Sequence, residues 1–115
     1  MNPNIENRTF EFSINLINFC REINEKDLSV QIILKQLIRA GTSVGANVAE
    51  GRAGSTKKDF INFNFHALKS ARETLYWLRL LNSLIIKTQC AMLIKEADEI
   101  SRILGKIIIN SRKNA

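Results

Sequence analysis

A run of small residues near the middle of the chain sets the strongest constraint on its fold. Residues 38–49, IRAGTSVGANVA, are expected to be helical, yet Gly41 and Gly45 stand four residues apart within them. Each glycine inside a helix costs about 1 kcal/mol relative to alanine, so a compensating contact is expected. Small residues at this spacing let a neighbouring helix approach closely, and Arg39 and Glu50 exclude a lipid setting. We therefore predict a tightly packed pair of helices here.

A polar row follows the same predicted helix. It consists of Arg39, Ser43, Asn47 and Glu50, whose spacings of four, four and three place them on one face. Such a row is ordinarily a solvated stripe. Here it alternates with small residues suited to a helix interface, so we expect it inside the bundle, where a charge must be paired. Glu73 on the next helix is the expected partner of Arg39, and the five residues together would fix the register of the two helices.

The rest of the chain is compatible with helices throughout. Pro3 is the only proline in 115 residues, so nothing breaks a long helix. A hydrophobic content of 45% suffices for one core. The pattern predicts a single all-α domain over residues 1–115, with helices near residues 4–23, 28–50, 57–84 and 88–111. Short connections favour antiparallel neighbours, hence an up-down-up-down four-helix bundle.

Local signals mark the ends of the two central helices. Asp27 or Ser29 is the expected N-cap of the second helix. Gly51 is expected just beyond its last residue, in the left-handed region. Thr56, with Asp59 three residues later, resembles a capping box at the start of the third helix.

The helices carry more apolar residues than one bundle core needs. In the first helix, Phe10 and Ile14 are expected to belong to the inward apolar face, as is Met92 in the fourth. In the third, Phe65 and Trp77 lie outside the predicted inward seam. A helix that is apolar over so much of its girth is expected to be covered. The simplest way to cover these residues is self-association with other copies of the chain.

The central residues resemble a known family. The run QLIRAGTSVGANVAEGRAGSTKKDFINF, continued by ALKSARETLYWLRLL, resembles the four-helix-bundle proteins encoded in intervening sequences of bacterial 23S ribosomal RNA genes. The related accessory proteins of diversity-generating retroelements share the pattern. The S-x-x-A-N-x-A-E-G core, residues 43–51, is its most specific part. The resemblance implies a ring of copies, often a homopentamer, associated with nucleic acid and without known catalysis.

Positive charge is expected to gather at one end of the bundle. The chain has 17 Lys and Arg residues against 11 Asp and Glu residues, a net charge of +6. Alternating helices bring together the start of the first, the turn between the second and third, and the end of the fourth. Such a basic end suits a phosphate backbone, because each neutralised phosphate releases counterions. The alternative is that the charge only keeps the protein soluble. The candidate nucleic-acid contacts, those on the turn first, are Arg52, Lys57, Lys58, Arg8, Arg72, Arg79, Arg112 and Lys113.

The sequence contains no catalytic or metal-binding motif that withstands inspection. His66 is the only histidine, without a cysteine or carboxylate at ligand spacing. Cys20 and Cys90 fit two buried thiols better than a disulfide in a reducing cytosol. Glu50 and Glu73 lack the Glu-x-x-His motifs of di-iron bundles. We expect no enzyme, no cofactor and no metal.

The sequence shows neither a membrane span nor a signal peptide. No apolar run approaches the roughly 20 residues that span a bilayer, and the first ten residues lack a signal-peptide pattern, so a cytoplasmic protein is expected. Stacking platforms for bases are not expected, and Tyr76 and Trp77 are assigned to packing between copies. The alternative to nucleic-acid binding is a scaffold for a partner enzyme such as a reverse transcriptase, as the retroelement relatives imply.

Overall fold

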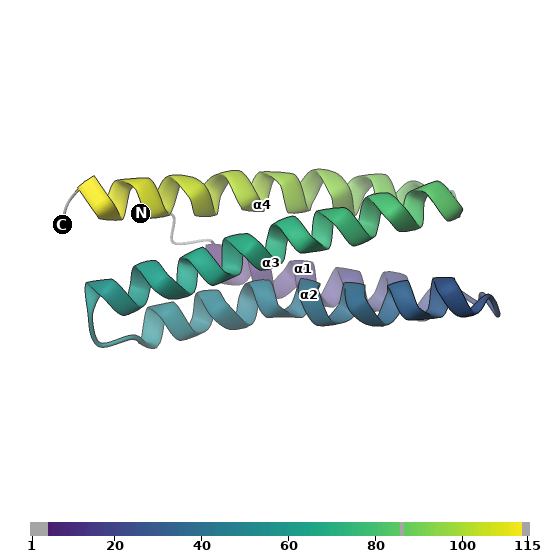
Figure 1. Cartoon of the computed structure of the whole chain (residues 1–115), viewed down its shortest axis with the longest axis horizontal. Coiled ribbons are helices and arrows are strands. Elements are labelled where there is room, and N and C mark those ends of the chain that lie inside the picture. Colours follow the sequence, from purple (N-terminus) through teal and green to yellow (C-terminus); the bar gives the residue numbers. More distant parts are fainter. Residues whose placement is uncertain (1–4, 86, 114–115) are drawn as a thin grey trace.

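The computed structural model describes residues 5–85 and 87–113, which form four helices (Figure 1). These are α1 (Ile5–Glu22), α2 (Leu28–Ala53), α3 (Lys57–Leu84) and α4 (Thr88–Lys113). Each helix packs against its neighbour in sequence, and α1 also packs against α4. The bundle measures 49 × 20 × 19 Å. The predicted all-α four-helix bundle is confirmed.

The predicted starts of α2 and α3 are confirmed by their caps. Asp27 Oδ1 accepts the backbone N–H groups of Ser29 and Val30, at 2.8 and 3.3 Å. Thr56 Oγ1 accepts the backbone N–H of Asp59 at 3.0 Å. Each cap satisfies donors that the first turn of a helix leaves without an intrahelical partner. The two long central helices therefore begin where the local sequence directs them to begin.

The end of α2 differs from the prediction. The helix continues to Ala53, and Gly51 lies buried inside it with no positive φ. A Cβ on Gly51 would lie 3.1 Å from Phe63 Cβ and 3.2 Å from Asn64 Nδ2 on α3. Gly51 is therefore a site of close helix approach, and the expected left-handed turn was wrong. Gly54, with extended backbone angles, is the C-cap.

The outer helices also depart slightly from their predicted bounds. α1 begins at Ile5 in the described part of the chain, and residue 4, predicted as its start, lies outside the described residues. α4 continues to Lys113, two residues beyond the predicted end. The basic residues near the carboxyl end of the chain are thus carried on a helix.

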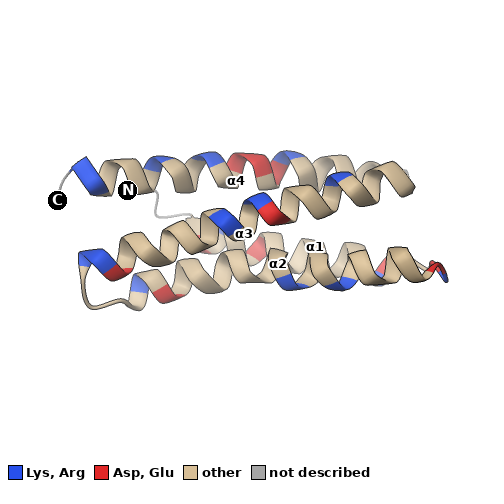
Figure 2. Cartoon of the chain, viewed as in Figure 1, with Lys and Arg blue, Asp and Glu red and all other residues tan. Residues whose placement is uncertain are grey.

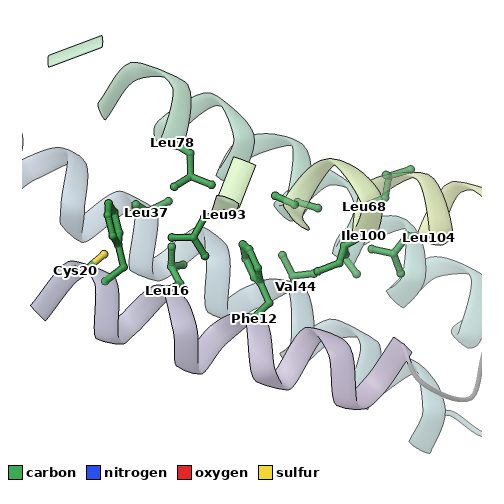
Figure 3. Close-up of a cluster of buried hydrophobic side chains, with 14 of the residues drawn as sticks. Phe12, Leu16, Cys20, Leu37, Val44, Leu68, Leu78, Leu93, Ile100 and Leu104 are labelled. Atoms are coloured by element: carbon green, nitrogen blue, oxygen red, sulfur yellow. The ribbon is translucent and has the colours of Figure 1, made fainter. Parts of the chain in front are cut away.

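The core is built from leucine, isoleucine, valine and phenylalanine of all four helices (Figure 3). Leu16, Leu37, Leu78 and Leu104 have no exposed surface at all, and each comes from a different helix. Burying one such side chain contributes about 1.5–3 kcal/mol relative to leaving it in water. Hydrophobic burial across the four helices is therefore the main source of stability.

The predicted close pairing at the small residues is confirmed, and the helix that approaches is α1. A Cβ on Gly41 would overlap Cδ2 of the buried Leu16. A Cβ on Gly45 would lie 3.3 Å from the backbone oxygen of Thr9. The contact with α1 offsets the helix-propensity cost of the two glycines.

Both cysteines are free and buried, as predicted. Cys90 Sγ donates to the backbone oxygen of Leu78 at 3.3 Å. Burial raises the pKa of the Cys20 thiol to about 11, with a smaller contribution from Cys90. The thiols are thus neutral core groups.

Some apolar residues predicted to face the core lie outside it. Phe10 is 63% exposed and Met92 is 67% exposed. In α1, Phe12 and Leu16 face the core, whereas Phe10 and Ile14 form a second row with the same spacing of four. Both rows satisfy helical periodicity, but only one can meet the neighbouring helices.

Candidate nucleic-acid interface

The two halves of the bundle carry very different charge (Figure 2). Residues 1–56, with α1 and α2, contain six Lys and Arg residues and six Asp and Glu residues. Residues 57–115, with α3 and α4, contain eleven Lys and Arg residues and five Asp and Glu residues. The entire net charge of +6 therefore comes from the half that contains α3 and α4.

Ion pairs between helices sharpen this division. Arg8 on α1 binds Glu96 and Glu99 on α4, with nitrogen–oxygen distances of 2.7 Å to each. Arg39 on α2 pairs with Glu73 on α3. Two arginines from the neutral half thus engage three of the five carboxylates of the basic half. The outer surface of α3 and α4 is more positive than the residue count alone implies.

Arg8 does not join the other candidate phosphate contacts. Its guanidinium also makes a second bond to Glu96, at 2.8 Å. Its partner Glu99 lies fourteen residues before Lys113, about 21 Å along α4. Arg8 meets α4 so far from its end because α1 is the shortest of the four helices and begins well inside the end of the bundle (Figure 1). The hydrogen bond from Arg8 lowers the pKa of Glu96, against the opposing effect of burial. Arg8 therefore lies at the contact between α1 and α4, and its expected place at the basic end was wrong.

The remaining candidates at the bundle end are brought together. The turn between α2 and α3 and the last turn of α4 lie at the same end of the molecule (Figures 1 and 2). We call the exposed cations there the basic end; they are Arg52, Lys57, Lys58, Arg112 and Lys113. Arg52 Nε lies 3.6 Å from Glu6 Oε1, a loose surface pair. Loose exposed pairs contribute little to stability, so Arg52 can exchange this partner for a phosphate.

A second group of cations runs along the outside of α3 and α4. We call it the basic face; its members, all exposed, are Lys69, Arg72 and Arg79 on α3 and Lys95, Arg102 and Lys106 on α4. Spacings of three and seven on α3, and of seven and four on α4, keep each set on one side of its helix. Sequence reasoning missed Lys69 and the three α4 residues, although this spacing was the available signal.

Little in the described structure opposes the basic face. Arg102 pairs with Asp98 at 3.0 Å, one turn before it on α4. Lys69 Nζ lies 5.9 Å from the centre of the Phe65 ring, a cation–π contact. The guanidinium groups of Arg72 and Arg79 make no ion pair or hydrogen bond with any residue that the structure describes.

The predicted polar network is partly correct. The Arg39–Glu73 pair forms as expected, but the Arg39 side chain is 55% exposed, so the expected burial was wrong. Ser43 Oγ donates to the backbone oxygen of Arg39, and Asn47 Nδ2 donates to that of Ser43, at 2.8 and 2.9 Å. Glu50 is exposed. The row borders the α2–α3 seam because the valines and small residues of α2 occupy the inward side.

The single histidine and the acidic residues of the described chain form no cluster that could hold a metal ion. His66 is exposed, and its ring meets Phe63 edge-on with centroids 6.4 Å apart. Within residues 5–85 and 87–113, no group of three or more His, Cys, Asp or Glu is placed to hold a metal ion. Over the same residues, no helix combines the length and the apolar character needed to cross a membrane.

Fold and surface together define a class: a small antiparallel four-helix bundle with paired charges between its helices and a basic outer surface. Residues 2–106 match the family model of the 23S rRNA-intervening sequence protein. The chain belongs to that family. It is also similar to a protein of unknown function from the S23 ribosomal protein family of Bacteroides thetaiotaomicron, known from a crystal structure. The two share 35% identity over 90% of this chain and 97% of that one, with a TM-score of 0.81. No curated protein matches the chain.

Proposed function

We propose that this protein is a self-associating, non-catalytic protein of the cytoplasm that binds nucleic acid electrostatically. The division of charge carries the proposal. One half of the bundle holds the whole net charge of +6, and three of its five carboxylates are engaged at the seams by Arg8 and Arg39. The basic end and the basic face would contact the phosphate backbone.

The basic end offers both charge and hydrogen-bond donors to a phosphate. Lys57 and Lys58 open α3, whose amino end carries the positive pole of the helix dipole. Lysines and arginines that contact phosphates position a nucleic acid without reading its bases. The proposed binding is therefore strong at low salt, weak at high salt and largely independent of sequence.

Self-association would multiply these contacts. Phe10 and Ile14 on α1 form an exposed apolar row in the electrically neutral half of the bundle. Covering this row with another copy would remove its apolar surface from water. Several basic surfaces in one ring, five in the assembly that the family resemblance implies, would act together on one strand, so that weak single sites give useful affinity.

Two triple variants with the same net charge test where the nucleic acid binds. One replaces Arg52, Lys57 and Lys58 of the basic end by alanine. The other replaces Arg21, Lys26 and Lys35 by alanine, three exposed cations near the opposite end of the bundle. Fluorescence anisotropy with labelled RNA and DNA between about 50 and 200 mM salt measures affinity and its salt dependence.

We expect the basic-end variant to lose affinity and about three units of the salt slope, one for each lost phosphate contact. The matched variant should retain a nearly unchanged slope. Equal losses in both would show that total charge matters and that the basic end is no site. Wild-type protein without salt-dependent binding would remove the nucleic-acid function altogether.

A second candidate function is a scaffold for a partner protein, and the exposed Phe10 and Ile14 row favours it. Adjoining apolar side chains that stay exposed can be covered by a partner protein. A packed apolar interface should respond little to salt, whereas phosphate binding weakens steeply. Salt dependence of the complex with its partner therefore separates the two candidates.

A further inference from the structure

The outer side of α3 holds a groove that combines an exposed aromatic ring with two arginines. It is an open depression of about 560 Å³, within the range of about 300–1,000 Å³ found for ligand sites. The residues that line it are Arg72, Leu75, Tyr76, Arg79, Leu80 and Ser83. It lies within the basic face, yet charge alone does not account for its aromatic and aliphatic lining.

Tyr76 is exposed but held in place. The residue is 59% exposed, and its ring meets that of Trp77 edge to face, with centroids 5.1 Å apart and planes at 75°. Trp77 Nε1 donates to Glu73 Oε2 at 2.9 Å, and the same carboxylate oxygen pairs with Arg39 of α2. Because Trp77 is anchored in this way, Tyr76 loses less conformational freedom when a ligand stacks on it.

The two arginines flank the ring. Arg72 lies four residues before Tyr76 and Arg79 three residues after it, so all three share one side of the helix. The arginines are about 10.5 Å apart along the helix axis. Glu73, the nearest carboxylate in sequence to Arg72, is engaged by Arg39 and Trp77. Both guanidinium groups are therefore available to anions.

A second ring on the same helix continues the pattern. Phe65 is 44% exposed, and Lys69 lies over its face at 5.9 Å. Phe65 precedes Tyr76 by eleven residues, which is about 16.5 Å along α3. The outer side of α3 thus alternates exposed rings with cations over several turns.

We propose that this groove is a subsite for single-stranded nucleic acid, with one base stacked on Tyr76 and backbone phosphates bound by Arg72 and Arg79. The inference rests on the proposed nucleic-acid function and specifies the kind of strand. Unpaired bases stack on aromatic side chains, whereas a duplex keeps its bases within its own stack and presents mainly phosphates. An acidic peptide would form ion pairs with the arginines, but it carries no flat base in each repeat unit that would stack on the Tyr76 ring.

The test compares Tyr76→Ala with Tyr76→Phe, using a single-stranded 20-mer and a duplex of the same sequence in anisotropy titrations. Loss of base stacking should weaken single-strand binding about 5- to 100-fold in Tyr76→Ala. Tyr76→Phe keeps the ring and should bind like the wild type. Duplex affinity should be unchanged in both variants. Tyr76 is exposed, so both variants should keep the helical circular dichroism spectrum.

A double variant, Arg72→Ala with Arg79→Ala, separates the contribution of charge. It should weaken both the single strand and the duplex and lower the salt slope by about two units. If Tyr76→Ala affects both forms equally or neither, the subsite is overturned while salt-dependent binding keeps the proposed function standing. Displacement of the strand by polyglutamate as readily from Tyr76→Ala as from the wild type would identify a general anion surface and overturn the subsite. Wild-type protein that binds neither form would overturn both proposals.

Discussion

The α1–α2 pair and the α3–α4 pair use the same secondary structure but present different surfaces. In α1 and α2, Gly41 and Gly45 allow close backbone approach, and the charges of that half cancel. In α3 and α4, charge is unbalanced, and a Cβ added to Gly105 of α4 would meet no atom of another helix within 4 Å. One hairpin brings its two helices together at glycines, and the other displays cations. Helical structure alone therefore says little about the role of each helix.

The seams between the two hairpins connect these roles. Arg8 and Arg39 belong to the neutral hairpin of α1 and α2, and they form ion pairs with carboxylates of the basic hairpin of α3 and α4. The ion pairs lie at the α1–α4 and α2–α3 contacts, where they help to fix how the hairpins meet. They also offset two of the three negative charges of Glu73, Glu96 and Glu99, which would otherwise weaken an anion-binding surface.

The largest effect is expected from changes in the exposed apolar row of α1. Phe10→Ser with Ile14→Ser should convert the proposed assembly to monomers, because the row that another copy would cover becomes polar. Met92→Ser with Ile109→Ser, two exposed residues of α4, is the matched control and should leave the assembly intact. Light scattering measures the mass of each. An assembly that survives the α1 changes would assign self-association to another surface.

An intermediate effect compares one glycine from each hairpin. Gly41→Ala should lower the free energy of unfolding by about 1–3 kcal/mol, because the added methyl group overpacks the core against Leu16. Gly105→Ala meets nothing and should raise it by about 0.5–1 kcal/mol through helix propensity. Urea unfolding gives both values. Effects of the same sign would contradict the difference in packing between the two hairpins.

The smallest effect concerns the seam. Arg8→Ala should cost about 1 kcal/mol near neutral pH, because it leaves the partly buried Glu96 without its main partner. Arg102→Ala breaks a more exposed pair within α4 and should cost a few tenths of a kcal/mol.

The stabilisation by the Arg8–Glu96 ion pair should depend on pH. Arg8 holds the folded-state pKa of Glu96 below its ordinary value of 4.5. The stabilisation is therefore complete above pH 4.5 and disappears as the pH falls through the folded-state pKa. Wild type and Arg8→Ala should converge in acid when unfolding is followed against pH. A difference that stays constant down to low pH would rule out this ion pair as its cause.

Much of the fold was predictable because its signals are local. Asp27 and Thr56 cap helices wherever those helices pack, and Gly41 within a helical run required a close neighbour. The family core in residues 43–51 added the expected bundle. The Arg39–Glu73 pair was also predictable, since opposite charges on adjacent helices had few other partners.

Other features depended on how each helix rotates and slides against its neighbours. Periodicity offered two equivalent apolar rows on α1, and only packing selects Phe12 over Phe10. The offset start of α1 placed Arg8 against the middle of α4, away from the basic end. The exposure of Tyr76 depends in the same way on the rotation of α3, and its predicted packing between copies stays a prediction. Relations of this kind are set by the whole bundle and leave no local mark in the sequence.

The anchoring of Trp77 provides an optical reporter for the groove. Trp77 is the only tryptophan of the chain, its indole N–H is bonded to Glu73, and its ring touches Tyr76. Indole emission responds to changes in the immediate surroundings of the ring. A strand that settles on Tyr76 should therefore change the intrinsic fluorescence of the unlabelled protein, whereas contacts confined to the distant basic end should leave it unaltered.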